Sequence, residues 1–345
     1  MHHYHEMESL LTQCYMQSIY SIAEPSQIAA ARRAAAELSR RLGFSDVQAG
    51  RLALVITEAG TNLIKHAVDG FLIIRPVEHA AGAWIEVIAM DSGPGIANLN
   101  ASLHDGVSTA NSPGTGLGAM QRLSDAFDAY TEPGKGSVFF MQVTATAQAV
   151  RDLGLQLGAI CLPIASEELC GDTWNLACSG HALSLMVGDG LGHGPDAYQA
   201  SSLAMQVLTD NPSLHPVGLI ELSHAALRGT RGAAVAIAHV DFHRRTLQFA
   251  GIGNIAACVQ TGDSRRHLLS HNGIVGNNVR KIQQFDAEFP SESLLIMHSD
   301  GIGTQWDINR YPGLVNRHSA IIAAVLYRDF RRERDDVTVL VLKHS

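Results

Sequence analysis

Short glycine-rich blocks fall into two unlike groups along this 345-residue chain, and that division constrains the fold more than any other feature. The first group lies in the first half and reads Glu58-Ala-Gly-Thr-Asn62, Asp91-Ser-Gly-Pro-Gly95 and Gly114-Thr-Gly-Leu-Gly118. The second group carries aspartate in every block and reads Gly171-Asp172-Thr-Trp, Asp189-Gly-Leu-Gly-His-Gly194, Ser299-Asp300-Gly301 and Asp335-Asp336-Val-Thr338. Because a chain of this length has room for about two domains, each group predicts a domain of its own.

The pattern between the blocks predicts two different architectures. We expect one domain over residues 1–145 and a second over residues 150–345, joined by the weakly periodic linker 144–152. The first reads as helices on one face of a mixed sheet, with helices at 25–43, 46–68 and 116–127 and strands at 84–90 and 137–143. The second has grouped strands from residue 155 to residue 342 and helices near 196–209, 216–227 and 319–330. That pattern predicts a β-sandwich flanked by helices.

Composition excludes several classes of protein. Hydrophobic residues make up 46% of the chain and charged residues 17%, so both domains can bury a core. We find no apolar run near the ~20 residues that a membrane span needs, and the His-rich start lacks a signal-peptide pattern. The net charge of −8 and the absence of a basic-aromatic stripe argue against nucleic acid. Five cysteines without a CxxC pair indicate buried reduced thiols. We therefore expect a cytoplasmic protein.

The first group of blocks supplies the parts of a nucleotide site. Glu58, Asn62 and His66 follow one another at intervals of four, so they share one helix face. The amide oxygen of Asn62 suits Mg²⁺, and Glu58 could accept the proton of an attacking hydroxyl. Asp91 ends an apolar strand and could accept from the amine of adenine, while the loop 114–118 offers backbone N–H groups to phosphates. Any one block could be an ordinary turn or helix cap, but together they favour a nucleotide site.

The second group predicts a metal centre. Asp172, Asp189, Asp300 and either Asp335 or Asp336 lie at expected strand ends, and clustered carboxylates repel one another unless a cation joins them. Oxygen ligands suit Mg²⁺ or Mn²⁺, and two such ions can activate water for attack on a phosphoryl group. The glycine after Asp189 allows its carbonyl to turn toward a metal. His193 reads equally well as a proton donor or as a brace of its turn, and any single Asp-Gly could be only a turn.

The first-half motifs resemble the GHKL ATPase family, and more closely its small bacterial serine kinases that act as anti-sigma-factor and stress-response switches. The resemblance covers residues 19–143 and implies a Bergerat-type α/β sandwich that binds ATP. The short segment 96–113 and the absence of a preceding dimerisation helix fit these kinases better than histidine kinases. The implied general base is Glu58 and the Mg²⁺ ligand is Asn62, with Asp91 on adenine. The remaining pocket positions are His66, Gly93, Gly95, Gly114, Thr115, Gly116, Leu117, Gly118 and Ser137, the last where the family often has Thr.

The second-half motifs resemble the metal-dependent PPM serine/threonine phosphatases, in a compact bacterial branch with sporulation and stress-response members. The resemblance covers residues 153–343 and implies an αββα sandwich. It implies Asp189 as the ligand that bridges two metals, completed by Asp172, the Gly190 carbonyl, Asp300 and Asp335. Asp336 then supports the ligands. Larger relatives hold phosphate with an Arg near the first acidic block, yet residues 160–172 contain none. The arginines at 328, 331, 332 and 334 read as a solvated helix end.

Together the two resemblances predict an α+β two-domain protein that regulates a bacterial partner-switching or stress-response pathway. The first domain would phosphorylate serine or threonine, and the second would remove that phosphate. The implied partner is a STAS-domain antagonist or a stressosome-like scaffold protein. The alternative is a phosphatase whose N-terminal domain binds ATP without catalysis, either to sequester a partner or to regulate the second domain.

Overall fold

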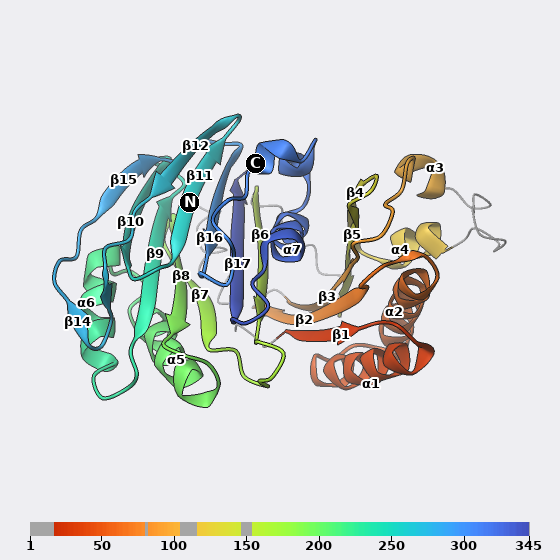
Figure 1. Cartoon of the computed structure of the whole chain (residues 1–345), viewed down its shortest axis with the longest axis horizontal. Coiled ribbons are helices and arrows are strands. Elements are labelled where there is room, and N and C mark those ends of the chain that lie inside the picture. Colours follow the sequence, from red (N-terminus) through yellow and green to blue (C-terminus); the bar gives the residue numbers. More distant parts are fainter. Residues whose placement is uncertain (1–16, 80–81, 104–115, 146–153, 345) are drawn as a thin grey trace. The chain divides into compact units, whose positions relative to one another are not determined.

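The computed structural model describes residues 17–79, 82–103, 116–145 and 154–344. These residues form two compact units (Figure 1). The first, called here the N-terminal unit, comprises Tyr15–Arg151 together with Arg310–Arg328. The second, the C-terminal unit, comprises Asp152–Asn309 together with Asp329–Ser345. A short stretch from late in the sequence therefore completes the first unit.

The N-terminal unit is built on a five-stranded sheet in the order β1-β2-β3-β5-β4. Its strands are β1 (Ser18–Ser21), β2 (Phe71–His79), β3 (Gly82–Met90), β4 (Ala126–Glu132) and β5 (Gly136–Thr144). All four pairings are antiparallel, so the expectation of a mixed sheet is wrong for the described strands. The reason is local, because β2–β3 and β4–β5 are hairpins, and short turns join only antiparallel strands.

Helices cover one face of this sheet. They are α1 (Pro25–Arg41), α2 (Asp46–His66), α3 (Leu99–Leu103) and α4 (Gly116–Leu123). The sequence marks the start of α2, since the Ser45 hydroxyl accepts from the Gln48 N–H while the Gln48 side chain reaches back to the Ser45 N–H. The helix expected at 116–127 ends earlier, where the Arg51 guanidinium binds the Leu123 carbonyl at 2.9 and 3.1 Å. Residues 126 and 127 belong instead to β4.

Two five-stranded antiparallel sheets form the C-terminal unit, in the orders β15-β10-β9-β8-β7 and β12-β11-β16-β17-β6. The sequence pattern predicts eight strands in this unit, and each lies within an observed one. The expected strands are 155–160, 174–177, 182–187, 233–240, 246–250, 256–259, 294–298 and 337–342. The first sheet contains β7 (Asp172–Ser179), β8 (Ala182–Gly190), β9 (Ala233–Asp241), β10 (Thr246–Ile252) and β15 (Phe285–Glu288). The second contains β6 (Leu155–Leu162), β11 (Ala256–Thr261), β12 (Ser264–Leu268), β16 (Ser293–His298) and β17 (Val337–His344). The short strands β13 (Gly273–Ile274) and β14 (Asn278–Val279) pair apart from both.

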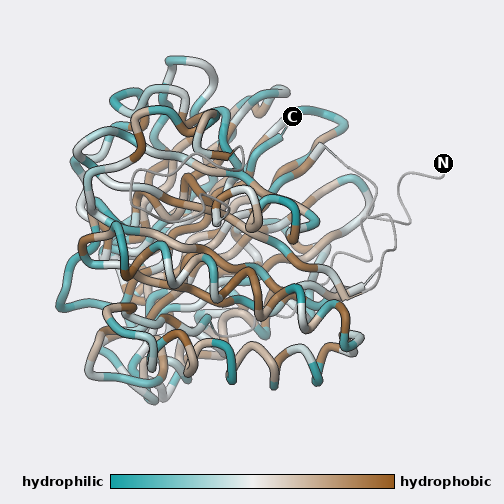
Figure 2. Tube along the Cα trace, turned by 90° about the vertical axis from the view of Figure 1, so that its right-hand side faces the viewer, coloured by the Kyte–Doolittle hydropathy of each residue, from teal (hydrophilic) through white to brown (hydrophobic). Residues whose placement is uncertain are grey.

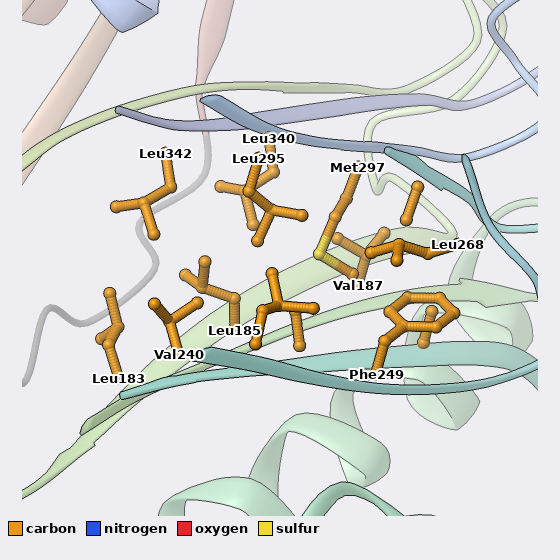
Figure 3. Close-up of a cluster of buried hydrophobic side chains, with 14 of the residues drawn as sticks. Leu183, Leu185, Val187, Val240, Phe249, Leu268, Leu295, Met297, Leu340 and Leu342 are labelled. Carbon is orange, nitrogen blue, oxygen red and sulfur yellow. The ribbon is translucent and has the colours of Figure 1, made fainter. Parts of the chain in front are cut away.

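The main core of this unit lies between the two sheets. Side chains from β8, such as Leu185, meet side chains from β16 and β17, such as Met297 and Leu340, across the sandwich (Figure 3). A second apolar layer packs α5 (Pro195–Asp210) and α6 (Pro216–Ala226) on the outer face of the first sheet. Along the chain as a whole, hydrophobic residues are frequent in the strands and hydrophilic residues gather in turns (Figure 2). None of the described helices combines the length and the apolarity needed to cross a membrane.

The stretch Arg310–Arg328 packs on the sheet of the N-terminal unit. It contains most of α7 (Ser319–Phe330), which the sequence predicts with the same bounds. The His318 ring stacks on Phe140 of β5 with centroids 3.9 Å apart, and the His318 N–H donates to Asp128 Oδ2 of β4 at 2.7 Å. Further along α7, Arg328 Nη1 donates to the Asp91 carbonyl at 3.2 Å. Arg328 is thus partly buried by the unit, and the expectation of a solvated helix end is wrong for this residue.

Candidate nucleotide site and metal centre

Glu58 and Asn62 lie side by side on α2, beneath the first turn of α4. A Cβ atom at Gly116 would lie 3.2 Å from Glu58 Oε2 and 3.3 Å from Asn62 Oδ1. The start of α4 can come this close because Gly116 has no side chain. The Asn62 Nδ2 atom is buried and has no hydrogen-bond partner among the described residues. A buried amide without a partner costs free energy, so a ligand is the natural way to satisfy it.

The other positions of the glycine loop divide into two groups. Gly114 and Thr115 lie outside the described residues. Leu117 packs against the apolar core, and Gly118 is buried in α4. The structure therefore brings Gly116, rather than Leu117, to the polar face of α2.

Asp91 follows β3 and is only 8% exposed. Its Oδ1 accepts the Gly93 N–H at 2.7 Å, and its own N–H donates to the Ser137 carbonyl at 3.0 Å. Burial raises the pKa of Asp91, while the Gly93 and Ser137 hydrogen bonds and the Arg328 charge oppose that rise. A buried carboxylate with acceptor capacity to spare can receive a hydrogen bond from an exocyclic amine.

Two glycines lock the Asp91 turn against the β4–β5 hairpin. A Cβ at Gly95 would lie 2.3 Å from the Glu132 carbonyl oxygen, and a Cβ at Gly136 would lie 2.0 Å from the Asp91 carbonyl oxygen. Both positions have positive φ, at 68° and 91°. The sequence pointed to Gly95 but assigned no role to Gly136, whose partner becomes visible only when the strands pair.

Ser137 and His66 reach this turn in different ways. Ser137 is buried, and its hydroxyl lies 3.0 Å from the Thr131 hydroxyl across the hairpin. His66 is exposed in the last turn of α2, and its carbonyl would lie 3.2 Å from a Cβ at Gly93. His66 therefore packs against the Asp91 turn through its backbone carbonyl and not through its side chain.

Asp172 and Asp189 begin the candidate metal centre of the C-terminal unit. They are directly opposed across β7 and β8. Asp172 is 2% exposed, and its Oδ2 has no hydrogen-bond partner among the described residues. Burial, reinforced by the charge of Asp189, raises the pKa of Asp172 well above its usual range. Burial also raises the pKa of Asp189 to about 7, with further contributions from Asp300, Asp335 and Asp336.

Asp300, just after β16, and Asp335, just before β17, complete the acidic set. Asn254 Nδ2 donates to Asp300 Oδ2 at 2.6 Å. Burial raises the pKa of Asp335, and the neighbouring Asp300 charge raises it further. In the described part of the chain no three Asp, Glu, His or Cys side chains converge tightly enough to form a finished metal site. The orphaned Asp172 oxygen and this mutual repulsion nevertheless fit a divalent cation, which would remove both costs.

Asp336 plays a different part from its neighbour Asp335. Its Oδ1 accepts the Ile164 N–H and its Oδ2 accepts the Gly171 N–H, both at 2.8 Å. A Cβ at Gly301 would lie 2.0 Å from the Asp336 carbonyl oxygen, so the Ser299-Asp300-Gly301 turn packs on its backbone. Asp336 thereby ties the acidic turns together.

The Asp189–Gly194 loop leads into α5, whose Ala197 carbonyl would lie 2.0 Å from a Cβ at Gly190. His193 Nδ1 lies 2.7 Å from Glu167 Oε1, and the His193 side chain is 60% exposed. This contact favours the brace over the proton donor for His193. Sequence reasoning missed Glu167 because nothing in its surroundings marks it.

Arg231 is a second residue that the sequence did not reveal. Its Nη1 would lie 3.0 Å from a Cβ at Gly192, and its Nη2 lies 2.7 Å from Asp196 Oδ2. The backbone supports this approach, since the Leu191 N–H donates to the Gly232 carbonyl at 3.0 Å. Arg231 is half exposed, so its guanidinium stands beside the acidic loop within reach of solvent.

Comparison with known proteins gives a family match for each part of the chain. Residues 22–142 match the family described as histidine kinase-like ATPase domain, and residues 179–345 match stage II sporulation protein E. Serine/threonine-protein kinase RsbT of Bacillus subtilis (strain 168) is 32% identical over 121 residues, which are 35% of this chain and 91% of that protein. Phosphoserine phosphatase RsbX of the same organism is 24% identical over 137 residues, covering 39% of this chain and 69% of that protein.

A solved structure described as "The bacterial stressosome: a modular system that has been adapted to control secondary messenger signaling" is 28% identical, with a TM-score of 0.52. The match covers 55% of this chain and 99% of the chain in that structure. The expected two-domain α+β class, GHKL-like and then PPM-like, is confirmed. Over residues 22–142 the chain belongs to the histidine kinase-like ATPase family, and over residues 179–345 it carries a phosphatase domain of the stage II sporulation protein E type.

Proposed function

We propose that this chain is a bifunctional switch that phosphorylates a protein partner with one domain and dephosphorylates it with the other. The partner would be a STAS-domain antagonist or a stressosome-like scaffold protein in the cytoplasm. Support comes from the similarity of the first domain to a serine/threonine-protein kinase and of the second to a phosphoserine phosphatase. One chain then sets the phosphorylation level of its partner by the balance of two activities.

The arrangement of Glu58, Asn62 and Gly116 carries the kinase half of the proposal. With ATP bound, Asp91 accepts from the adenine amine, and the first turn of α4 presents N–H groups to the phosphates. Asn62 would hold Mg²⁺ through its amide oxygen. Glu58 accepts the proton of a serine or threonine hydroxyl while that oxygen attacks the γ-phosphorus, and the bond from phosphorus to the bridging oxygen breaks to release ADP. The Glu58 and Asn62 side chains both face the start of α4 because Gly116 lets α4 approach α2.

The phosphatase half depends on the acidic cluster. Asp189, which is paired with Asp172 across β7 and β8 and feels the charges of Asp300 and Asp335, would bridge two Mg²⁺ or Mn²⁺ ions, with the Gly190 carbonyl as a further ligand. Such ions would lower the pKa of a bound water and neutralise the charge of the phosphoryl oxygens. The protein holds the carboxylates in place through Asp336, whose two oxygens fix residues 164 and 171.

Arg231 is our candidate for holding the substrate phosphate. A guanidinium can bind two phosphate oxygens at once, and Arg231 lies beside Gly192 in the acidic loop. Its present partner, Asp196, is largely exposed, so the Arg231–Asp196 ion pair is weak enough to exchange. Arg231 would then take the role of the phosphate-binding arginine that residues 160–172 lack.

Radiolabel transfer tests the proposal. The full chain is incubated with γ-labelled ATP, Mg²⁺ and a purified STAS-domain protein. Label should appear on the partner and decay once ATP is removed. Glu58→Gln should prevent labelling, whereas Asp189→Asn should leave the label in place. A partner that wild type does not label would exclude the kinase assignment, whereas equal labelling by Glu58→Gln and wild type would exclude Glu58 as the general base.

A second candidate function is a phosphatase regulated by a non-catalytic ATP-binding domain. One observation favours it: Arg328 binds the Asp91 carbonyl and precedes Asp335 by only seven residues in the sequence. Nucleotide at Asp91 could then affect the segment that carries a metal ligand. A non-hydrolysable ATP analogue should in that case change aryl phosphate hydrolysis by the Glu58→Gln variant. Under the bifunctional proposal alone, the analogue should leave this rate unchanged.

A further inference from the structure

Two cysteines lie next to the acidic cluster without taking part in it. Cys161 lies on β6, Cys170 lies two residues before Asp172, and their sulfur atoms are 3.8 Å apart. The Cys161 thiol is also within 3.5 Å of the Asp172 carbonyl, and the Thr338 hydroxyl donates to its sulfur at 3.3 Å. Cys161 is therefore in contact with Asp172 at the start of β7 and with β17, the strand that follows Asp336.

The segment after Cys170 is tightly held. The Gly171 N–H donates to Asp336 Oδ2 at 2.8 Å, and the Gly171 carbonyl accepts the Gly190 N–H at 3.1 Å. A Cβ at Gly171 would lie 2.7 Å from Asp336 Oδ2 and 2.8 Å from the Ala197 methyl. Because Gly171 is closely packed and hydrogen-bonded through both its N–H and its carbonyl, we expect a displacement of Cys170 to disturb Asp172.

Cys161 is the more firmly fixed partner. It is paired with Thr338 within an eight-residue ladder between β6 and β17. A disulfide needs its sulfurs about 2.05 Å apart, so they must approach by about 1.8 Å. We expect most of this movement on the Cys170 side, which would pull the Gly171 N–H from Asp336 and shift Asp172.

We propose that Cys161 and Cys170 form a peroxide-sensitive disulfide that switches off the metal centre. The effect on activity rests on the proposed phosphatase function, while the modification itself does not. The Cys161 thiolate, the less buried of the two, attacks hydrogen peroxide, breaks its O–O bond, becomes a sulfenic acid and releases one water after proton transfer. The second thiol then displaces the hydroxyl from that sulfur, giving the disulfide and a second water. Two thiols are oxidised and one peroxide is reduced, and a dithiol restores the starting state.

The chain offers matched controls for this pair. Cys178 and Cys258 are buried in the same unit. Burial raises the pKa of Cys178 to about 12, which keeps it as a poorly reactive thiol. Serine at 161 or 170 keeps the size and polarity of the residue but cannot form the bond.

The test uses the full chain, reduced and then treated with hydrogen peroxide. Peptide mapping after thiol alkylation should recover a linked 161–170 peptide. After peroxide, the Mn²⁺ affinity measured by titration and the rate of aryl phosphate hydrolysis should each fall about 10-fold or more. Both should recover with dithiothreitol. Cys161→Ser and Cys170→Ser should keep full Mn²⁺ affinity after peroxide, and Cys178→Ser should respond like wild type. Circular dichroism shows whether each variant is folded. One folded variant of Cys161→Ser and Cys170→Ser is enough for the test.

Three results would overturn the inference. Peroxide treatment that leaves residues 161 and 170 unlinked would exclude the modification. A complete 161–170 disulfide with unchanged Mn²⁺ affinity would exclude its control of the metal centre. Reduced wild type that binds no Mn²⁺ would refute the proposed metal centre and with it the switch, whereas the mapped disulfide would still establish the modification site.

Discussion

Two glycines of one hairpin allow the role of the Asp91 turn to be isolated. Gly134 and Gly136 both have positive φ, at 83° and 91°. A Cβ at Gly134 meets nothing within 4 Å, whereas a Cβ at Gly136 would lie 2.0 Å from the Asp91 carbonyl oxygen. Alanine at either position brings the same backbone strain, but only Gly136→Ala forces the hairpin away from Asp91.

The expected magnitudes follow from this geometry. Positive φ costs an alanine about 1–2 kcal/mol, and this should be the whole effect of Gly134→Ala. At Gly136 the backbone must also move about 1.3 Å to reach an ordinary carbon–oxygen separation of about 3.3 Å, and overpacking of this kind adds about 1–3 kcal/mol. Moving Asp91 away from its ligand should cost a charge-assisted hydrogen bond of about 1.5–3 kcal/mol, a loss of roughly 10- to 100-fold in ATP affinity.

Calorimetric titration with Mg-ATP and urea unfolding, applied to both variants, measure these differences. Gly134→Ala should bind ATP like wild type and lose only the smaller amount of stability. If the two variants match each other in both measurements, then contact between Gly136 and Asp91 does not position the nucleotide site, and our reading of the hairpin is wrong.

Three further variants test other features. Asn62→Ala should abolish Mg²⁺-dependent binding of ATP while far-ultraviolet circular dichroism stays unchanged; titration with and without Mg²⁺ measures this, and equal affinities would contradict the assignment. Arg231→Ala should raise KM for a phosphopeptide about 10-fold with little change in kcat, against Arg228→Ala as an exposed control; steady-state kinetics that show equal KM values would remove Arg231 from phosphate binding. Glu86→Gln should lower the free energy of unfolding by about 3–5 kcal/mol, because Arg75 Nη2 lies 2.6 Å from Glu86 Oε2 inside the sheet. Urea unfolding measures this loss, and a loss of less than about 1 kcal/mol would mean that the ion pair is solvated.

Local signals account for what the sequence predicts well. The Pro25 and Ser45 helix starts and the apolar strands of the C-terminal unit depend on neighbouring residues, and the structure has them where the patterns indicate. Strand β12, Ser-Arg-Arg-His-Leu, was missed because its polar residues show no alternation. It is held by pairing with β11, a partner that the local pattern cannot reveal.

Long-range contacts account for the rest. The sequence places Glu58 and Asn62 on one helix face, but only the packed structure shows that Gly116 lies against them. It also gives no sign that Glu167 meets His193, 26 residues away, or that Arg231 meets Gly192. These contacts join loops whose composition is ordinary, so pattern and propensity carry no information about them.

The two units interleave along the chain, and this has a consequence during synthesis. The sheet face at Phe140 receives His318 only after almost the whole C-terminal unit has been translated. At about 5–20 residues per second, the ribosome needs on the order of 10–40 s to travel from residue 145 to residue 328. Until then the nascent first unit exposes an apolar face, so this chain gives chaperones a long interval in which to act and cannot release a finished kinase-like domain ahead of its phosphatase.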